Sequence, residues 1–195
     1  MSSIENIQWV DGTWTHPPAR ISKSDVGLCI TAKKGSDAWR NTSYGFIHDS
    51  EHALVVEFAN NTAMEVEFTA NFAEEFDQAG IFIKSTPANW IKAGVEYADG
   101  QAQLGAVVTN PNSDWSLAPV PDWNQQRILI RASRVGGAIT IRACINGNEL
   151  QLVRVIPFSS DLNAQAGPFV CAPTRAGLTV PFHTWQVVAP DSSLH

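Results

Sequence analysis

The residues with the clearest potential for catalysis are two carboxylates in the middle of the chain. Glu65 and Glu67 are two positions apart, which in a β-strand places both side chains on one face, roughly 7 Å from each other. Retaining glycoside hydrolysis requires carboxyl groups about 5–5.5 Å apart, and inverting hydrolysis about 6.5–9.5 Å. The pair is therefore compatible with attack on a glycosidic bond. The alternative is two surface ion pairs with Lys84 and Lys92, which the expected strand register brings near.

A second group of side chains suggests recognition of a sugar without catalysis. Sugar binding requires an aromatic ring against the apolar face of the sugar, with polar groups near its hydroxyls. The predicted ligand-binding residues on strands are Gln78, Trp90, Lys92, Glu96 and Gln103. Those expected to join them from the segments WRNTSYG and SDWS are Trp39, Arg40, Tyr44, Asp114 and Trp115. The alternative is that the aromatic residues only pack in the core or at its edge.

The scaffold that positions these residues is predicted to consist of β-strands. Polar and apolar residues alternate with a period near two, and no long stretch carries a helical stripe. Turn signals such as Asp99-Gly100, Gly136-Gly137 and Asn146-Gly147 separate short strands. This spacing indicates a sandwich or barrel, and we treat residues 1–195 as one domain.

The strand register can be derived from the turn at Asp99-Gly100. A two-residue hairpin there places Gly94 opposite Gly105, and a loop over residues 85–89 places Gly80 opposite Gly94. The three glycines then form one row on the face opposite the core. A row without side chains predicts an open trough in which a ligand lies against the backbone. The side of the sheet taken by Trp115 is not determined by this register.

The strand before this group is expected to be its next neighbour. If residues 73–76 form a connecting loop, Thr69 faces Gly80 and the pair Glu65 and Glu67 joins the trough face. A second set of strands is predicted at residues 127–134, 138–145 and 149–156, with Leu150 and Leu152 expected on its buried face. The sandwich is completed by strands expected at residues 19–23, 27–32, 53–58, 167–172 and 178–188.

Composition excludes several classes of partner and predicts a location. The net charge of −6 and only 13 Lys and Arg residues argue against nucleic-acid binding. No apolar run approaches the roughly 20 residues that span a bilayer, so no membrane partner is expected, and the first residues do not resemble a signal peptide. Three widely spaced cysteines in apolar runs predict reduced thiols in a cytoplasmic protein.

No metal or cofactor is expected from the sequence. His48, Asp49, Glu51 and His52 are close together and could be interpreted as a metal cluster. A third, separate ligand is not evident, however, and a polar turn between strands explains these residues more simply.

Several stretches resemble a known family. They are DAWRNTSYGFIHDSEHAL (37–54), FDQAGIFIKSTPANWIKAGVEYADGQAQLGAVVTN (76–110), SDWS (113–116) and GPFVCAPTRAGLTVPFHTW (167–185). They are similar to a domain-of-unknown-function family of the concanavalin A-like lectin/glucanase superfamily, a family that includes a yeast regulation-of-enolase protein. The resemblance implies an antiparallel jelly-roll sandwich of two curved sheets, with ligands on the concave face. The E-x-D-x-x-E pattern of the glucanases is absent, which weakens the case for catalysis.

These observations predict an all-β jelly-roll sandwich that binds a carbohydrate or another small polar ligand. Two alternatives remain open at this point. One is a glycan-active enzyme that uses the carboxylates of this region. The other is a protein-interaction module that acts as a homodimer or larger homo-oligomer, since exposed aromatic residues on a trough also suit a partner loop.

Overall fold

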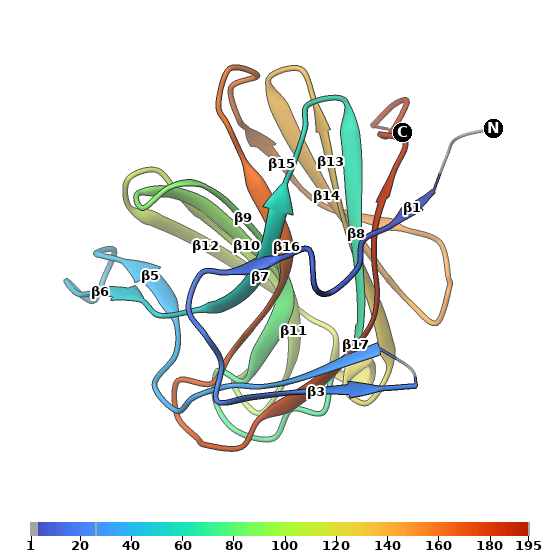
Figure 1. The fold of residues 1–195 in the computed structure, drawn as a ribbon. Helices are drawn as coiled ribbons and strands as arrows, with labels where there is room; N and C mark the ends of the chain where they lie inside the picture. The colour runs from blue at the N-terminus through green and yellow to red at the C-terminus, as the bar shows by residue number, and fades with distance from the viewer. Residues whose placement is uncertain (1–3, 26, 195) are drawn as a thin grey trace.

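The computed structural model describes residues 4–25 and 27–194 and is built of β-strands in two large antiparallel sheets (Figure 1). The larger sheet has the spatial order β15 (Gln151–Pro157), β14 (Ala138–Ile145), β13 (Arg127–Val135), β8 (Thr62–Thr69), β17 (Thr179–Val188), β4 (Gly27–Thr31) and β3 (Arg20–Ser24), and β1 (Glu5–Asn6) also pairs with β17. The seven-stranded sheet has the order β12 (Ser113–Pro119), β11 (Gln101–Thr109), β10 (Asn89–Ala98), β9 (Gln78–Thr86), β16 (Gln165–Cys171), β7 (His52–Glu57) and β2 (Thr13–Trp14). A hairpin of β5 (Ala38–Arg40) and β6 (Ile47–Asp49) forms a third, small sheet, and one 3-10 turn covers Pro121–Trp123.

The two large sheets pack against each other through their apolar faces. Val66 and Ile130 from one sheet and Ile81 and Ile91 from the other are each at most 1% exposed and belong to one core cluster. Polar and apolar residues alternate along each strand, so each sheet has one apolar face. The two apolar faces are removed from water when the sheets pack against each other. The expected sandwich is therefore confirmed. Among residues 4–25 and 27–194, no helix has the length and apolar character needed to cross a bilayer.

The register predicted for the central strands is confirmed. Gly94 pairs with Gly105 on one side and with Gly80 on the other. The turn at Asp99 and Gly100 has positive φ values of 54° and 77°, as a tight two-residue hairpin requires. Because the side-chain period of a strand is two, this register sends every second residue of β9, β10 and β11 to the outer face of the sheet, away from the core.

The place predicted for β8 is wrong. It does not pair with β9, so Thr69 does not face Gly80; β8 lies in the other sheet, between β13 and β17. The strand that pairs with β9 on that side is instead β16, and Phe169 occupies the position opposite Gly80. The error has a simple cause. A strand crossing to the opposite sheet still points its apolar residues into the shared core, so the alternation of polar and apolar residues fits both placements.

The second set of strands follows the prediction except in β15. Ile128 pairs with Ile145 as expected, but the ladder between β14 and β15 shifts at Arg142. This bulge places Leu152 opposite Arg142, and Leu152 is 45% exposed rather than buried. A one-residue irregularity reverses the faces of all the residues beyond it.

The glycine row is required by close contact between backbones. A Cβ atom on Gly94 would lie 2.2 Å from the carbonyl oxygen of Ala79, and one on Gly80 would lie 2.1 Å from that of Ala93. Contacts this short are sterically forbidden, so alanine at either position would force the neighbouring strand away. Glycine destabilises a strand, but it is required here because any side chain would collide with the backbone of the adjacent strand.

Candidate functional site

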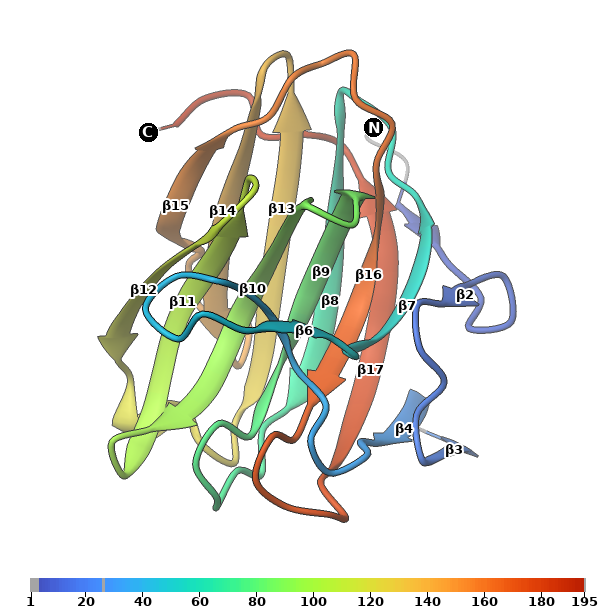
Figure 2. The ribbon, with the colours of Figure 1, turned by 90° about the vertical axis from the view of Figure 1, so that its left-hand side faces the viewer.

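The outer face of the seven-stranded sheet is partly covered by the β5–β6 hairpin, which crosses in front of the central strands (Figure 2). Three contacts hold it to the turn between β11 and β12. The backbone N–H of Arg40 donates to Ser113 Oγ at 2.9 Å, and its side-chain Nε donates to the Pro111 carbonyl oxygen at 3.0 Å. Asn41 Nδ2 donates to Asn112 Oδ1 at 2.8 Å. The hairpin is thus fixed over the sheet and encloses a space beneath it.

That space is a pocket of about 320 Å³, within the size range of small-molecule sites. Its lining residues are Asp37, Trp39, Tyr44, Phe46, His48, Phe76, Gln78, Lys92, Glu96, Val107, Trp115, Pro173 and Thr174. The aromatic side chains come mainly from the hairpin, and the charged and amide groups come mainly from the sheet. An apolar wall above a small set of polar groups is the usual composition of a ligand site.

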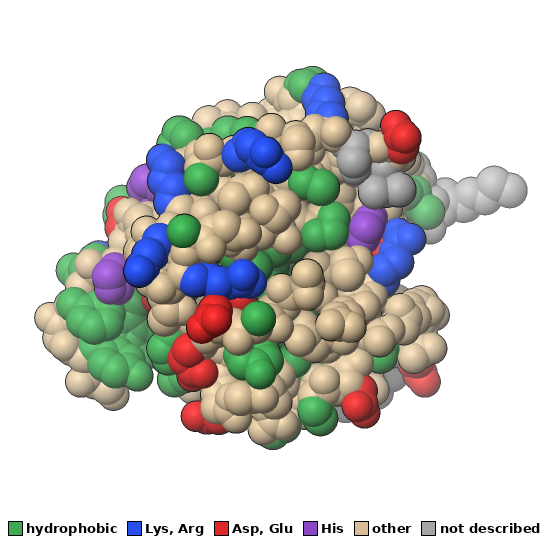
Figure 3. Space-filling model, turned by 90° about the horizontal axis from the view of Figure 1, so that it is seen from below, with side chains coloured by type: hydrophobic (Ala, Val, Ile, Leu, Met, Phe, Trp, Pro, Cys, Tyr) green, Lys and Arg blue, Asp and Glu red, His purple; other side chains and the backbone are tan. Residues whose placement is uncertain are grey.

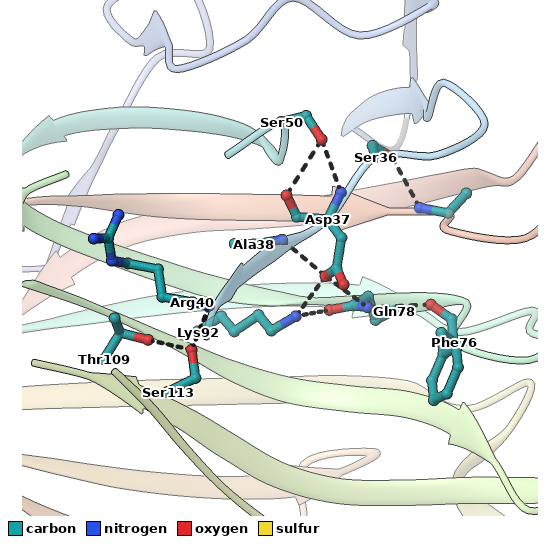
Figure 4. Close-up of polar contacts among 11 residues, drawn as sticks. Ser36, Asp37, Ala38, Arg40, Ser50, Phe76, Gln78, Lys92, Thr109 and Ser113 are labelled. Atoms are coloured by element: carbon teal, nitrogen blue, oxygen red, sulfur yellow. Dashed lines mark hydrogen bonds and ion pairs between the residues drawn. The ribbon is translucent and has the colours of Figure 1, made fainter. Parts of the chain in front are cut away.

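The floor of the pocket is a hydrogen-bonded network around Lys92 (Figure 4). Its Nζ donates to Asp37 Oδ1 at 2.7 Å and to Gln78 Oε1 at 2.8 Å, and the Lys92 residue is only 5% exposed. Burial is the largest single influence and lowers the pKa of the ammonium, but the acidic groups around it, Asp37 first among them, together outweigh burial and raise the Lys92 pKa above its ordinary value. Lys92 therefore remains charged and neutralised by Asp37.

Glu96 differs from the rest of the floor because it has an unused acceptor. Its Oε1 is buried and has no hydrogen-bond partner among the described residues. Burial raises the pKa of this carboxyl to about 7; Lys92 opposes that shift and Asp37 adds to it. A buried polar atom without a partner is unfavourable, and native structures usually satisfy such atoms with water or a ligand.

The wall opposite the hairpin includes a strained residue. Phe76 has φ of 65°, a conformation that bulky side chains rarely adopt. Its backbone N–H donates to the Tyr97 carbonyl oxygen at 2.7 Å, and its own carbonyl accepts from Gln78 Nε2 at 3.2 Å. These bonds hold the Phe76 backbone against the strain. Backbone strain of this kind is concentrated at functional sites.

Aromatic rings at the mouth of the pocket are open to solvent. Tyr44 is 56% exposed, Phe46 43% and Trp115 38%, and the Tyr44 and Phe46 rings stack with centroids 5.3 Å apart. Trp39 lies behind them, in edge contact with both Tyr44 and Trp115. Hydrophobic side chains gather on the lobe where this hairpin projects, at the left in Figure 3.

The structure brings together more than half of the predicted ligand-binding residues. Those that line the pocket are Trp39, Tyr44, Gln78, Lys92, Glu96 and Trp115. Trp115 pairs with Val107, whose side chain lines the pocket, so Trp115 lies on the outer face, a point left open by the sequence. The remaining predicted residues lie outside the pocket lining.

Two of these remaining residues are buried. Trp90 is 4% exposed and stacks on Phe82 beneath the hairpin, so it supports the pocket rather than facing it. Gln103 donates to the Ala98 carbonyl oxygen at 3.1 Å, near the end of the β10–β11 hairpin. The other two, Arg40 and Asp114, hold neighbouring segments in place. Arg40 holds the hairpin as described above, and the Asp114 carboxylate accepts from Arg154 at 2.9 Å, linking β12 to β15 in the other sheet.

The glycine row itself is not an open trough. Phe169 lies opposite Gly80 and Leu117 opposite Gly105, and both side chains fill the ends of the row. The remaining cavity over Gly94 has about 20 Å³, enough for one water molecule. The expected channel is thus closed by the protein's own side chains, and the usable space lies beside it, under the hairpin.

The pair Glu65 and Glu67 is not part of this site. Both lie on the outer face of the eight-stranded sheet, where Glu65 pairs with Arg131 and Glu67 with Arg127. The expectation that the two carboxylates share a face with Lys84 and Lys92 is therefore wrong, for the same reason as the misplacement of β8. Their arginine partners leave no free carboxylate there for glycoside hydrolysis.

Sequence reasoning missed other members of the pocket, above all Asp37. Asp37 precedes the hairpin directly, and its partner Lys92 is 55 positions away, so spacing alone gives no signal. The positive φ of Phe76 could not be predicted either, because phenylalanine rarely adopts that conformation. Of the missed residues, only Phe46 and His48 could have been recognised, because with the predicted Tyr44 they give three aromatic rings in five residues.

Comparison with known proteins agrees with this architecture. Residues 14–190 match the family described as "Protein of unknown function (DUF1349)". The chain is 34% identical over 196 residues to "Regulation of enolase protein 1" of Saccharomyces cerevisiae, covering 100% of this chain and 98% of that protein. A crystal structure of a functionally unknown protein from Saccharomyces cerevisiae is similar with a TM-score of 0.88 and 33% identity, covering 95% of this chain and 100% of that one.

A carbohydrate-binding module has the same fold. The module CBM66 from Bacillus subtilis matches with a TM-score of 0.55 at 12% identity, covering 90% of this chain and 95% of the module. At this level of identity the likeness concerns the fold alone.

Proposed function

Because the chain belongs to the family described as "Protein of unknown function (DUF1349)", which names no activity, we propose from the site itself that the pocket under the β5–β6 hairpin binds a carbohydrate or a sugar-like small molecule. The observation that carries the proposal is the unpaired, buried Oε1 of Glu96 in a pocket rimmed by Trp39, Tyr44 and Trp115. A hydroxyl donor on the ligand would satisfy this oxygen, while an aromatic ring would cover the apolar face of a sugar.

The charge of the floor favours a neutral or weakly basic ligand. Lys92 and Asp37 cancel each other, and Glu96, with a pKa of about 7, carries a partial negative charge at neutral pH. An anionic ligand would be repelled by Glu96 and would find the one ammonium already engaged. Polyhydroxylated neutral molecules and amino sugars meet these conditions, whereas sugar phosphates do not.

Catalysis on glycans is less well supported by the geometry. Within the described pocket lining the carboxylates are Asp37 and Glu96, and Asp37 accepts hydrogen bonds from Lys92 and from the Ala38 N–H at 2.8 Å. A carboxylate held this way is a weak nucleophile or base. Binding without turnover is the simpler outcome of this arrangement.

Isothermal titration calorimetry against a panel of neutral sugars, amino sugars and sugar phosphates tests the proposal. We expect binding of members of the first two groups, and a loss of about tenfold in affinity for Trp115→Ala, because ring stacking contributes roughly 1–1.5 kcal/mol. Trp115 is at the edge of the sheet and 38% exposed, so its removal leaves the fold intact. The matched control is Leu152→Ala, an exposed apolar residue on the other sheet, which should bind as the wild type does.

Two further measurements separate the alternatives. Release of reducing sugar from an oligosaccharide, abolished by Glu96→Gln, would replace the binding proposal with glycan hydrolysis. A second candidate is self-association through the exposed hairpin side chains Tyr44, Phe46 and Ile47. It would be supported by a dimer in sedimentation equilibrium that Phe46→Ser dissociates, together with no response to any sugar.

A further inference from the structure

A second cluster of ligating side chains lies at the start of β7, outside the pocket lining. His16, Asp49 and Glu51 each offer one nitrogen or oxygen atom, and these atoms all lie within 4.8 Å of one another. Glu51 is 1% exposed, and neither of its carboxylate oxygens has a hydrogen-bond partner among the described residues. A buried carboxylate with two unsatisfied oxygens is costly unless something charged or hydrogen-bonding occupies the space beside it.

The backbone around this cluster is firmly held. Thr15 Oγ1 donates to the Glu51 carbonyl oxygen at 3.0 Å, and the backbone N–H groups of Thr15 and Ala53 are bonded across the same junction. His16 Nδ1 lies 3.0 Å from that same carbonyl oxygen and 3.7 Å from Glu51 Oε1. The segment after β2 is thus fixed against β7, with the imidazole hydrogen-bonded to the Glu51 backbone and its Nδ1 near the Glu51 carboxylate.

Lys84 approaches the cluster but does not satisfy it. Its Nζ lies 3.6 Å from Asp49 Oδ1 and 3.9 Å from Glu51 Oε1, beyond hydrogen-bonding distance for both. Two carboxylates and one ammonium leave the cluster with one net negative charge when His16 is neutral. Lys84 is 22% exposed on its side chain, so its flexible stem can carry the ammonium out to solvent.

We propose that His16, Asp49 and Glu51 form a binding site for a divalent transition-metal cation of the zinc class, which takes the place of the Lys84 ammonium. One imidazole and two carboxylates suit such a cation, and three protein ligands leave a coordination position for water. Ligand atoms in a tetrahedral zinc site are roughly 3.3 Å apart. The 3.7 Å between His16 Nδ1 and Glu51 Oε1 must therefore contract by about 0.4 Å, and the widest spacing in the cluster, at most 4.8 Å, by up to about 1.5 Å, which the exposed Asp49 side chain can supply by rotation. His16 Nδ1 is the nitrogen that lies near Glu51 Oε1, so it is the one that would bind the metal. Its proton would then be carried by Nε2, and its hydrogen bond to the Glu51 carbonyl oxygen would be given up in exchange for the metal.

The site would have a structural consequence for the pocket. Asp49 ends β6, Glu51 directly precedes β7, and His16 lies shortly after β2. A cation bound to all three would pin the end of the hairpin to the main sheet. His48, the neighbour of Asp49, lines the pocket, so metal binding would fix that wall.

Calorimetric titration with zinc ion alone, after treatment of the whole chain with a chelator, tests the proposal. We expect one zinc ion per chain, a zinc-dependent rise in Tm, and at least a tenfold loss of affinity for Glu51→Gln and for His16→Ala. Lys84→Met should bind zinc more tightly, because it removes the competing charge. That last result distinguishes a metal site from an ordinary ion-pair cluster, in which Lys84→Met would only lower stability.

The control is Glu149→Gln, an exposed carboxylate on the β14–β15 connection, which should leave zinc binding unchanged. Circular dichroism establishes that each variant is folded. If Glu51→Gln does not fold, Asp49→Asn replaces it, since the Asp49 side chain is 52% exposed and tolerates substitution. Zinc affinity that is absent in the wild type, unchanged in these variants, or weakened by Lys84→Met would overturn the proposal.

Discussion

At the scale of single residues, the carboxyl group of Glu96 is strongly affected by its environment. Its carboxyl is 8% exposed, and its pKa is raised from 4.5 to about 7, mainly by burial. A group that binds its proton more tightly in the folded state stabilises the fold at low pH. That contribution is complete below about 4.5, declines as the pH rises, and is lost above about 7.

We therefore predict that Glu96→Gln stabilises the protein in mildly alkaline solution and leaves it nearly unchanged in acid. A raised pKa of this size corresponds to a cost on the order of 3 kcal/mol for the ionised form, and the neutral amide does not bear it. Urea unfolding of both proteins near pH 5 and near pH 8 measures the difference. Equal differences in the free energy of unfolding at the two pH values would show that Glu96 ionises normally. Glu149→Gln serves as the exposed control.

The Lys92–Asp37 pair makes a second residue-scale prediction. Lys92→Met leaves the Asp37 carboxylate without its closest cation, while a linear side chain of similar length keeps the packing. Removing one partner of a buried ion pair typically costs about 3–5 kcal/mol, and partial exposure of Asp37 places the expected loss at the lower end. Thermal and chemical unfolding of Lys92→Met and of the double variant Lys92→Met/Asp37→Asn test this. The double variant should recover part of the loss; if it recovers none, the pair does not act as a unit.

At the scale of elements, the glycine row determines how closely β9 and β10 approach. The Gly94→Ala substitution introduces a methyl group 2.2 Å from the Ala79 carbonyl oxygen, in the backbone of the adjacent strand. Backbone cannot move aside cheaply, so we predict a loss of roughly 2 kcal/mol or more in the free energy of unfolding. The control is Gly137→Ala, where a Cβ meets nothing within 4 Å. Similar stability for the two variants would contradict the account of the row.

Particular elements show what the sequence could predict. The register of β9, β10 and β11 was predictable because a two-residue turn fixes it and one face is apolar throughout. The partner of β9 was not, because the loop before Gln78 can lead to either sheet. That loop is held by the Asp77 carboxylate, which accepts from the N–H groups of Ala73 and Glu74 and from Arg175. Such long-range contacts leave no local pattern.

The candidate site was predictable only where it depends on which face of the sheet each strand residue occupies. Gln78, Lys92 and Glu96 follow from the register of β9 and β10, and all three line the pocket. The hairpin that covers them is a separate sheet, so its position over the strands depends on contacts such as Arg40 to Pro111. Trp90 was interpreted as a platform because the sequence could not show that this hairpin buries it.

At the scale of the whole molecule, the two outer faces differ in chemistry. The eight-stranded sheet carries a network in which Arg131 contacts Glu65 and Asp191, and Arg142 contacts Asp191 as well. The charges of this network are paired with one another. The seven-stranded sheet carries instead a half-enclosed pocket with an unpaired acceptor. The pocket proposed for recognition thus lies on one outer face of the sandwich, and the ion-pair network lies on the other.

The most direct test of this account is a nuclear magnetic resonance titration of the isotopically labelled chain with the tightest-binding sugar from the calorimetric panel. We predict that the shifted signals include the indole N–H groups of Trp39 and Trp115 and the backbone amides of β5, β6 and β10, while those of β13 and β14 stay in place. Shifts concentrated on the eight-stranded sheet, or no shifts with any sugar at millimolar concentration, would contradict the proposal that the pocket beneath the hairpin recognises carbohydrate.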